Sequence, residues 1–466
     1  MSHKKTKVFL IVPPVIYARQ PFIGIAYLLS YLKYNGYETK AWDLNTEILI
    51  ENDGDDDFWN QEKNCSEMFF KNKELFNSWV DKILDFDPQI VGFVTWGTSV
   101  YFSLQMAKII KEKCNNIKIV LGGYYCSIEG EKLIQNKNVD AVVIGEGEET
   151  LLEIVNGYSK GKVEYCKGAI LKNDNKIINC GLRAEIKNID LIPFPDFSDF
   201  CLDRYLFKYH IPLVFSRGCS WCCKFCTVYH CWKSLRCRTA ENIYQEILLR
   251  LKQYPMLKQF ELCDCAFNQD LELISKLCDM IIKDGLNIRF SGLAKINPKM
   301  DIELLRKMRK AGFVLCNYGV ESGSEKVLRS MGKNYTPEEA ERVIRDTYNA
   351  GINVVLNFIV GYPNETEKDF YETLRFIERI KDYVTNIAPG HECSIDHNFI
   401  EANPELFNVV FPKENISLWR TKDGLNTHEE RMRRVKIFND FVTSLKIPLR
   451  CGADDRRAMM SISQNI

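Results

Sequence analysis

The stretch Ser216-Arg217-Gly218-Cys219-Ser220-Trp221-Cys222-Cys223-Lys224-Phe225-Cys226 follows an apolar run and spaces three cysteines as C-x3-C-x2-C. The three are Cys219, Cys223 and Cys226. Three thiolates match three irons of one cubane and leave the fourth iron with an open coordination position, whereas a structural tetrahedral site takes four protein ligands. The stretch therefore predicts an incomplete iron–sulfur cluster with one position open for chemistry.

Two other interpretations of these cysteines stay open. A zinc knuckle would take a fourth ligand, for which His230 or Cys231 is available, and thiols in a reducing compartment can also be inert core residues. Cys222 offers a second spacing, C-x2-C-x3-C, with Cys219 and Cys226. We expect Cys222 to face away from the cluster or to pack against the protein.

The bulk composition is that of a globular protein. The 466 residues allow two to four domains, and 46% hydrophobic with 27% charged residues is enough for a sizeable core. Lys plus Arg equals Asp plus Glu at 62 each, so net charge indicates neither nucleic acid nor a membrane surface. A small-molecule or peptide substrate is favoured.

The cysteines also bear on the compartment. Eighteen of them lie at irregular spacings, and the apolar run Val8 to Val12 is cut short by Pro13-Pro14, so it predicts a first buried strand and no secretory leader. No apolar stretch reaches the roughly 18 residues that crossing a bilayer requires. We expect a reducing, cytoplasmic location and no membrane.

Downstream of Pro212, strand and helix patterns alternate. Six strands are predicted, at 213–215, 259–262, 288–291, 314–318, 354–360 and 386–388, with helices at 239–253, 270–283, 301–310, 337–349 and 367–381. Such repeats predict a partial (β/α)6 barrel with its active face at the carboxyl ends of the strands. The cysteine stretch lies on the first loop of that face.

Upstream, residues 7 to about 150 show the same alternation with shorter helices. Strands at 8–12, 38–43, 90–94, 117–121 and 141–144 predict a parallel, Rossmann-like sheet. The loops after Val12, Val94, Leu121 and Ile144 should open at one carboxyl edge, where open parallel sheets bind ligands. The acidic segment 51–57 predicts a solvated loop, because its carboxylates lack the spacing of a calcium site.

The boundaries follow from these patterns. A hairpin at 167–178 and the pair Pro193 and Pro195 predict a connector. We expect four parts: an α/β Rossmann-like domain at 1–155, a linker with a β-hairpin at 156–210, the partial barrel at 211–398, and a small helical cap at 399–466.

The cysteine triad, with aromatic Phe225 before the last cysteine, resembles the radical S-adenosylmethionine (SAM) enzymes. In that family the open iron of a [4Fe-4S] cluster chelates SAM, and the reduced cluster cleaves SAM to a 5′-deoxyadenosyl radical that abstracts hydrogen. The resemblance implies an external electron donor such as flavodoxin or ferredoxin. It also implies SAM contacts after successive strands, at Phe225, Asp264, Lys295, Glu321, Ser322 and Gly361.

The resemblance implies a role for each of these contacts, and two of them also have a simpler structural explanation. Phe225 would pack on adenine and Lys295 would hold the SAM carboxylate where relatives carry arginine, although lysine offers a point charge in place of a planar fork. Glu321 could instead cap groups at a strand end, and Gly361 could be only a turn.

The N-terminal domain resembles the cobalamin-binding domain that precedes many radical SAM barrels. The resemblance lies in the loops at the sheet edge and implies cobalamin contacts at Pro14, Gly24, Thr95, Gly122, Gly123, Gly145 and Glu146. No histidine lies between His3 and His210, so this domain offers no histidine ligand to cobalt. The glycines could also be the ordinary turns of a Rossmann-like domain that has kept only its shape.

Two features of the last third of the chain are less specific. A basic helix carries Arg431, Arg433, Arg434 and Lys436, a pattern more typical of a solvated face than of an anion site. His391, Cys393, Asp396 and His397 gather at the sixth strand, where we expect a polar network in preference to a metal site.

The resemblance as a whole implies a cobalamin-dependent radical SAM methyltransferase. One SAM would methylate cobalamin, and a second would supply the radical that activates an unactivated carbon of a small molecule or peptide. Alternatives are a rearrangement or cyclisation without methyl transfer, a tRNA methylthiotransferase, and a non-catalytic corrinoid sensor. Cys65, Cys114 and Cys126 lack the arrangement of the extra cluster that a methylthiotransferase carries.

Overall fold

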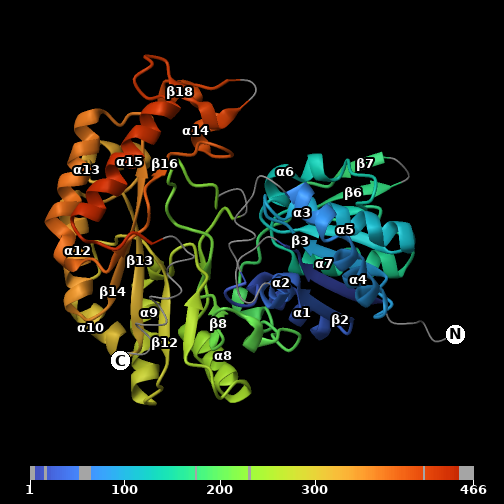
Figure 1. Cartoon of the computed structure of the whole chain (residues 1–466). Coiled ribbons are helices and arrows are strands. Elements are labelled where there is room, and N and C mark those ends of the chain that lie inside the picture. The colour runs from blue at the N-terminus through green and yellow to red at the C-terminus, as the bar shows by residue number, and fades with distance from the viewer. Residues whose placement is uncertain are drawn as a thin grey trace. The chain divides into compact units, whose positions relative to one another are not determined.

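The computed structural model describes residues 6–14, 18–51, 65–173, 176–228, 232–412 and 415–450. The chain forms two compact units, Met1–Pro212 with His230–Lys233 and Leu213–Tyr229 with Ser234–Ile466. Figure 1 draws the first unit mainly in blue to green and the second in yellow to red. The acidic segment 51–57, apart from the backbone of Glu51, and the zinc candidates His230 and Cys231 lie outside the described residues.

The first unit is built on a seven-stranded sheet in the order β2-β1-β3-β4-β5-β6-β7. Five strands are parallel: β1 (Lys7–Val12), β2 (Glu38–Asp43), β3 (Ile90–Val94), β4 (Lys118–Gly122) and β5 (Ala141–Val143). The hairpin β6 (Ala169–Asn173) and β7 (Lys176–Asn179) adds to β5 in antiparallel fashion. The hairpin expected in a linker is therefore the edge of this sheet.

Helices cover both faces of the first sheet. Helices α1 (Ile23–Tyr34) and α7 (Glu148–Ser159) pack together on one face. The other face carries α3 (Cys65–Lys71), α4 (Lys73–Leu84), α5 (Val100–Lys113) and α6 (Cys126–Leu133), whose apolar side chains form one core with odd-numbered residues of β1 and β3. A further short helix, α2 (Leu44–Glu51), follows β2. Strand order reverses between β1 and β3, which is the switch point where such sheets bind ligands.

The second sheet has the strand order β15-β14-β13-β12-β11-β8, with β16 beside β14, and apart from the first three residues of β8 it belongs to the second unit. Its strands are β8 (His210–Leu213), β11 (Gln259–Leu262), β12 (Arg289–Ala294), β13 (Phe313–Glu321), β14 (Asn353–Val360), β15 (Asn386–Ile387) and β16 (His391–Glu392). The strands follow one another in sequence order without a reversal, as they do in a (β/α) barrel, and the sheet forms a curled half barrel. The expected α/β architecture is confirmed.

The outer layer of this half barrel consists of α8 (Ala240–Gln253), α9 (Leu271–Lys283), α10 (Ile302–Lys310), α12 (Pro337–Asn349) and α13 (Glu367–Ile380). Each begins at a side chain that accepts a backbone N–H of its first turn, namely Thr239, Asp270, Asp301, Thr336 and Thr366. Helix α11 (Glu325–Met331), between β13 and α12, was not predicted.

The segment from residue 399 differs from the small helical cap that we expected. Helix α15 (His428–Ser444) packs against α13 and β14, and the Phe438 ring lies 5.6 Å from that of Phe358 in β14. It thus extends the outer layer (Figure 1). Helix α14 (Phe399–Ala402) and the strand pair β17 (Val409–Val410) and β18 (Arg420–Thr421) form a small second core with α11.

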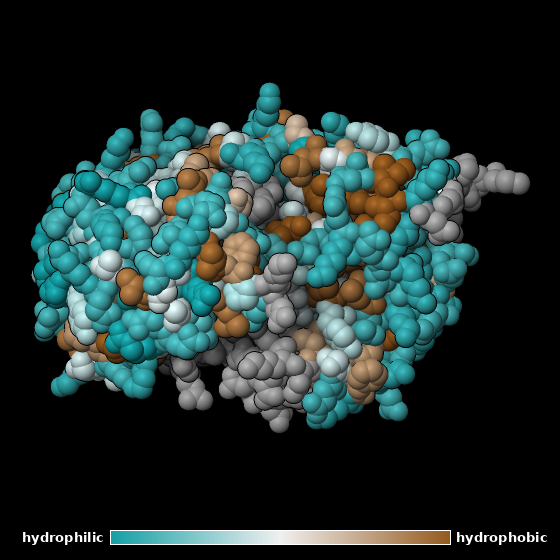
Figure 2. Space-filling view, turned by 90° about the horizontal axis from the view of Figure 1, so that it is seen from above, coloured by the Kyte–Doolittle hydropathy of each residue, from teal (hydrophilic) through white to brown (hydrophobic). Residues whose placement is uncertain are grey.

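The surface fits a globular protein. On the face drawn in Figure 2, hydrophilic side chains predominate, and hydrophobic ones lie among them in separate groups. Among the described residues, no helix combines the length and apolarity needed to cross a membrane.

Candidate functional site

The cysteine stretch forms a loop after β8, closed by the antiparallel pair β9 (Ser216–Arg217) and β10 (Arg236–Cys237). Gly218 has φ +81°, and a Cβ there would lie 2.1 Å from the Ser234 carbonyl oxygen, so only glycine fits where the two sides of the loop meet. The loop is therefore pinned at its base, next to the carboxyl end of the first barrel strand.

The three cysteines are close enough for each thiol to influence the pKa of its neighbours. Cys219, Cys223 and Cys226 are free thiols and half-buried, while Cys222 is exposed. Burial raises the pKa of Cys223 to about 11, and the neighbouring Cys226 and Cys219 add to this shift. Bound iron would lower the pKa of Cys223 again, because a thiol that coordinates a metal is deprotonated. The donor set of three mutually close thiols on one loop fits an iron–sulfur cluster with one open iron.

Asp264 fixes the start of this loop. Its carboxylate, almost fully buried, accepts hydrogen bonds from the backbone N–H groups of Phe215 (3.0 Å) and Ser216 (2.5 Å) and from the Ser216 hydroxyl (2.7 Å). Burial raises the pKa of Asp264 to about 6, and these donors oppose the rise. The sequence pointed to a SAM contact, but the carboxylate is engaged by the strand that leads into the loop.

Asp264→Ala is expected to lower the free energy of unfolding by about 1–3 kcal/mol, because buried N–H groups lose their acceptor. Urea unfolding of the apoprotein measures this change. The exposed Asp382, replaced by alanine, is the matched control and should stay within about 0.5 kcal/mol of wild type. An Asp264→Ala protein as stable as the control would show that the carboxylate does not hold the loop.

Two lysines and two aromatic rings surround the cysteines. Lys295 Nζ lies 4.1 Å from the centre of the Trp221 ring and 3.2 Å from Ser220 Oγ. Lys333 Nζ lies 5.5 Å from the centre of the Phe225 ring. Burial lowers the pKa of Lys295 to about 8, while the neighbouring thiols act in the opposite direction. The loop thus carries positive charge beside its thiols, which suits an anionic cluster and a ligand carboxylate.

Lys333 was missed by the sequence analysis, although it organises the end of strand β13. Its ammonium group pairs with Glu321 Oε1 at 3.2 Å and donates to the Gly319 carbonyl at 3.0 Å. Burial by itself would lower the pKa of Lys333, but the negative charge of Glu321 acts in the opposite direction, and the net shift of the pKa is upward. Gly332 beside it approaches the Cys222 carbonyl, and Lys224 N donates to the Met331 carbonyl at 3.0 Å. These contacts join α11 to the cysteine loop.

Glu321 and Ser322, at the carboxyl end of β13, have different surroundings. Glu321 is the last residue of β13 and has φ +69°, a conformation that non-glycine residues rarely adopt. The Ser322 hydroxyl, by contrast, lies 3.2 Å from Thr373 Oγ1 on α13 and accepts from Ser324 N. Glu321 therefore lies at the site, and Ser322 holds the turn against α13.

Gly361, at the end of β14, is held by the C-terminal segment. Its N–H donates to Glu365 Oε2 (2.7 Å), and its carbonyl accepts from Asn426 Nδ2 (3.1 Å). With φ +77°, a Cβ here would lie 2.4 Å from Arg431 Cγ. The glycine is required by this close approach of α15.

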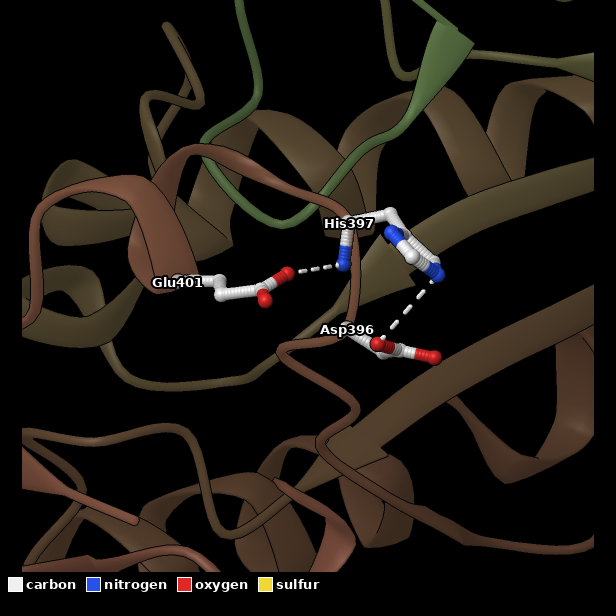
Figure 3. A group of neighbouring side chains, drawn as sticks. All are labelled: Asp396, His397 and Glu401. Atoms are coloured by element: carbon white, nitrogen blue, oxygen red, sulfur yellow. Dashed lines mark hydrogen bonds and ion pairs between the residues drawn. The ribbon is translucent and has the colours of Figure 1, made fainter. Parts of the chain in front are cut away.

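The cluster expected at the sixth strand is partly assembled. Asp396 and His397 lie with Glu401, as Figure 3 shows, and Glu401 Oε2 accepts the His397 N–H at 2.5 Å while His397 Nε2 lies 3.5 Å from Asp396 Oδ1. The ligand atoms of the three lie within 4.8 Å of one another. Next to them, Asn398 donates to the Phe225 carbonyl at 3.2 Å. The turn thus fastens the cysteine loop.

His391 and Cys393 lie apart from that turn. His391 is exposed in β16, and Cys393 is buried in the small second core, where its carbonyl accepts the indole N–H of Trp419 at 3.0 Å. The basic helix is likewise structural, since Arg431 and Arg434 are buried against carboxylates of Glu392 and Glu365.

In the first unit, the predicted residues Thr95, Gly122 and Gly123 lie together. Thr95 N and Oγ1 donate to the Gly122 carbonyl at 2.7 and 3.0 Å. Gly123 has φ +105°, and a Cβ there would lie 3.0 Å from Thr95 N and O. The loops after β3 and β4 therefore touch at the carboxyl edge of the sheet, which leaves no room for a larger residue at Gly123.

The other predicted residues of this unit have separate roles. Gly145 has φ +78° and donates to Ser127 Oγ at 2.9 Å, and nothing lies within 4 Å of where its Cβ would be. Glu146 Oε2 accepts the Ile186 N–H at 2.8 Å. Pro14 follows β1, but Gly24 lies inside α1 and not in the loop.

A stacked aromatic pair at this edge was missed. The rings of Trp96 and Tyr124, on the loops after β3 and β4, are 5.7 Å apart and nearly parallel. Trp96 is 43% exposed although it begins a tight turn with Ser99, whose N–H donates to the Trp96 carbonyl at 3.0 Å. An apolar surface held in this way at a ligand edge suits a flat ligand.

Comparison with known proteins agrees with both units. The model of the radical SAM superfamily matches residues 213–377, and the model of the B12 binding domain matches residues 15–155. An uncharacterized methyltransferase of Pyrococcus horikoshii is 27% identical over 81% of this chain and 79% of its own length. Other relatives are named anaerobic magnesium-protoporphyrin IX monomethyl ester cyclase and putative methylthiotransferase.

Solved structures share the fold. OxsB, a cobalamin-dependent SAM radical enzyme with aqua-cobalamin and SAM bound, aligns with a TM-score of 0.68 at 20% identity, over 87% of this chain and 56% of OxsB. This chain therefore spans little more than half of OxsB. TsrM of Kitasatospora setae, a radical SAM methyltransferase with cobalamin and a [4Fe-4S] cluster bound, aligns with a TM-score of 0.66 at 15% identity, over 92% and 82%.

The cysteine loop on a half barrel, the parallel sheet with its ligand edge, and the two matching family models lead to one conclusion. This chain is an enzyme with a radical SAM domain over residues 213–377 and a B12-binding domain ahead of it over residues 15–155, the combination whose cofactors are a [4Fe-4S] cluster, SAM and cobalamin.

Proposed function

We propose that this enzyme methylates an unactivated carbon of a small molecule or peptide. The observation that carries the proposal is the presence, in one chain, of three clustered thiols on a half barrel and a B12-binding sheet edge. The methyltransferase names of the Pyrococcus horikoshii relative and of TsrM support methyl transfer. When bound, the cluster, SAM and cobalamin supply the radical and the methyl group.

The residues of the second unit take distinct parts in this proposal. Cys219, Cys223 and Cys226 hold three irons, and Lys295 faces the carboxylate of SAM with its buried ammonium group. Phe225 offers its ring to the adenine. Glu321, fixed by Lys333, accepts hydrogen bonds from ribose or the methionine amino group. Asp264, Ser322 and Gly361 position the loops that carry these groups.

In the first unit, Thr95, Gly122, Gly123 and Gly145 bring backbone close to the corrinoid, with Pro14 and Glu146 at the same edge and Gly24 in the helix that follows the Pro14 loop. We propose that the stacked Trp96–Tyr124 pair, on the loops after β3 and β4, packs on the corrinoid ring.

Trp96→Ala is expected to weaken corrinoid binding roughly tenfold, because a large aromatic contact of about 1.5 kcal/mol is lost. Equilibrium dialysis of hydroxocobalamin, read by visible absorbance, measures the dissociation constant. Tyr34→Ala is the matched control, because Tyr34 is 79% exposed and ends α1. Equal affinities for the two variants would remove Trp96 from the site.

The proposed activity is tested with reconstituted, anaerobic enzyme and SAM carrying a labelled methyl group. A strong reductant or a reduced flavodoxin supplies electrons, and both 5′-deoxyadenosine and label in product are followed. Methyl transfer predicts both. Deoxyadenosine without labelled product would favour the rearrangement or cyclisation that the cyclase-named relatives suggest. No deoxyadenosine from fully loaded enzyme would contradict any radical function and favour the corrinoid sensor.

A further inference from the structure

The inner face of the half-barrel sheet is identified by which side chains meet helices. Tyr318 in β13 lies 2.9 Å from Thr347 Oγ1 on α12, and Phe358 in β14 contacts Phe376 of α13. These even-numbered residues point outward. The odd-numbered residues of these two strands, up to the register shift between Gly319 and Glu321, alternate with them and point to the inner face.

The lower part of this inner face is closed by a satisfied polar network. Gln259 Nε2 donates to Ser291 Oγ at 2.8 Å, and the Ser291 hydroxyl donates to Glu261. Ser291 is 1% and Gln259 7% exposed. These groups are engaged with one another.

Above that network lies a pair of amide side chains. Asn357 of β14 is in register with Gly319 of β13, which makes Asn317 its diagonal neighbour, and Asn357 Nδ2 donates to Asn317 Oδ1 at 2.6 Å. Both side chains are half-buried, and in the part of the chain that the structure describes they make no other hydrogen bond. The carbonyl oxygen of Asn357 and the amino group of Asn317 therefore remain available to accept from and donate to a ligand.

This result does not depend on how the amides are oriented. If the oxygen and nitrogen of both side chains are exchanged, the pair still forms one internal bond and still presents one donor and one acceptor. The neighbouring strand position is apolar, because Leu293 of β12 is in register with Asn317 and is 47% exposed.

We infer that Asn317 and Asn357 bind an amide of the substrate, in a carboxamide, lactam or peptide bond, while Leu293 contacts its adjoining carbon skeleton. An amide offers a donor and an acceptor side by side, which matches the pair. A carboxylate only accepts and an ammonium only donates, so either leaves one half of the pair without a partner. The inference rests on the proposed function and assigns its substrate class.

The test uses three matched probes: benzamide, methyl benzoate, which only accepts, and benzoate, which is an anion. Their affinities for the oxidised, cofactor-loaded enzyme are measured by ligand-observed NMR. Benzamide is expected to bind roughly tenfold more tightly than methyl benzoate, since a site built for hydrogen bonds rejects analogues that lack them. Equal binding of the amide and the ester, or preference for benzoate, overturns the inference.

Variants provide the second measurement. Asn317→Leu/Asn357→Leu is expected to reduce benzamide affinity roughly tenfold and to leave methyl benzoate affinity within twofold. The control is Asn349→Leu, at the exposed end of α12, which should change neither affinity. Iron and corrinoid are quantified in every sample. A loaded enzyme that binds all three probes alike overturns the amide assignment and leaves the proposed methyl transfer intact.

Discussion

Cys223→Ala is expected to abolish 5′-deoxyadenosine formation, with iron content and the visible absorbance of the cluster falling to background. The physical reason is that Cys223 is the central thiol of three, and two thiolates cannot hold a four-iron cluster. Cys219→Ala and Cys226→Ala are expected to behave in the same way. Iron and sulfide analysis after anaerobic reconstitution, followed by quantification of deoxyadenosine, measures both effects.

The matched control lies within the same loop. Cys222 is adjacent in sequence but exposed, so Cys222→Ala should keep full iron content and full deoxyadenosine release. If Cys222→Ala lost its iron while Cys223→Ala kept it, the ligand spacing would be C-x2-C-x3-C and the assignment of Cys223 as a ligand would be wrong. Failure of the wild type and of every single variant to take up iron would favour core thiols without a metal.

Arg431→Ala is expected to produce the largest loss of stability, about 3–5 kcal/mol, because it removes a fully buried side chain together with its ion pair to the half-buried Glu392 and its hydrogen bond to the buried Trp419 carbonyl. The Arg431 side chain is fully buried, pairs with Glu392 Oε2 at 2.9 Å and donates to the carbonyls of Trp419 (3.0 Å) and Ser417 (3.2 Å). Its guanidinium carbon lies 3.8 Å from the centre of the Trp419 ring. Urea unfolding of the apoprotein, followed by circular dichroism, measures the loss.

Arg433→Ala is the control, two residues further along α15. Its pairs with Glu430 and Glu367 are exposed, so its removal is expected to cost at most about 1 kcal/mol. Equal destabilisation by the two variants would mean that burial does not decide the contribution of these arginines. A stable Arg431→Ala protein would show that the C-terminal segment is not fastened through this side chain.

The sequence predicted what depends on local pattern. Cys219, Cys223, Cys226 and Lys295 could be placed at one sheet edge because each directly follows a strand whose period is visible in the sequence. Asp264 was placed correctly but given a different role, since its partners at Phe215 and Ser216 lie about 50 residues away. Lys333 was missed because its pairing with Glu321 crosses helix α11, which has no strong pattern of its own.

The same limit explains the ends of the second unit. Helix α15 was expected in a cap, but its packing on α13 and β14 rests on contacts such as Phe438 with Phe358 that periodicity does not show. The hairpin β6–β7 was predicted, but its pairing with β5 was not, because that pairing depends on tertiary contacts that the local sequence pattern does not show. The boundaries at residues 155, 210 and 398, and the individual cofactor contacts, stay predictions.

The hydrogen bond from Asn398 to the Phe225 carbonyl joins positions 173 residues apart. During synthesis, which proceeds from the N-terminus at about 5–20 residues per second, the ribosome must add those residues before the thiol-bearing turn gains its final support. We therefore expect a nascent chain arrested before Asn398 to take up iron less well than the complete chain.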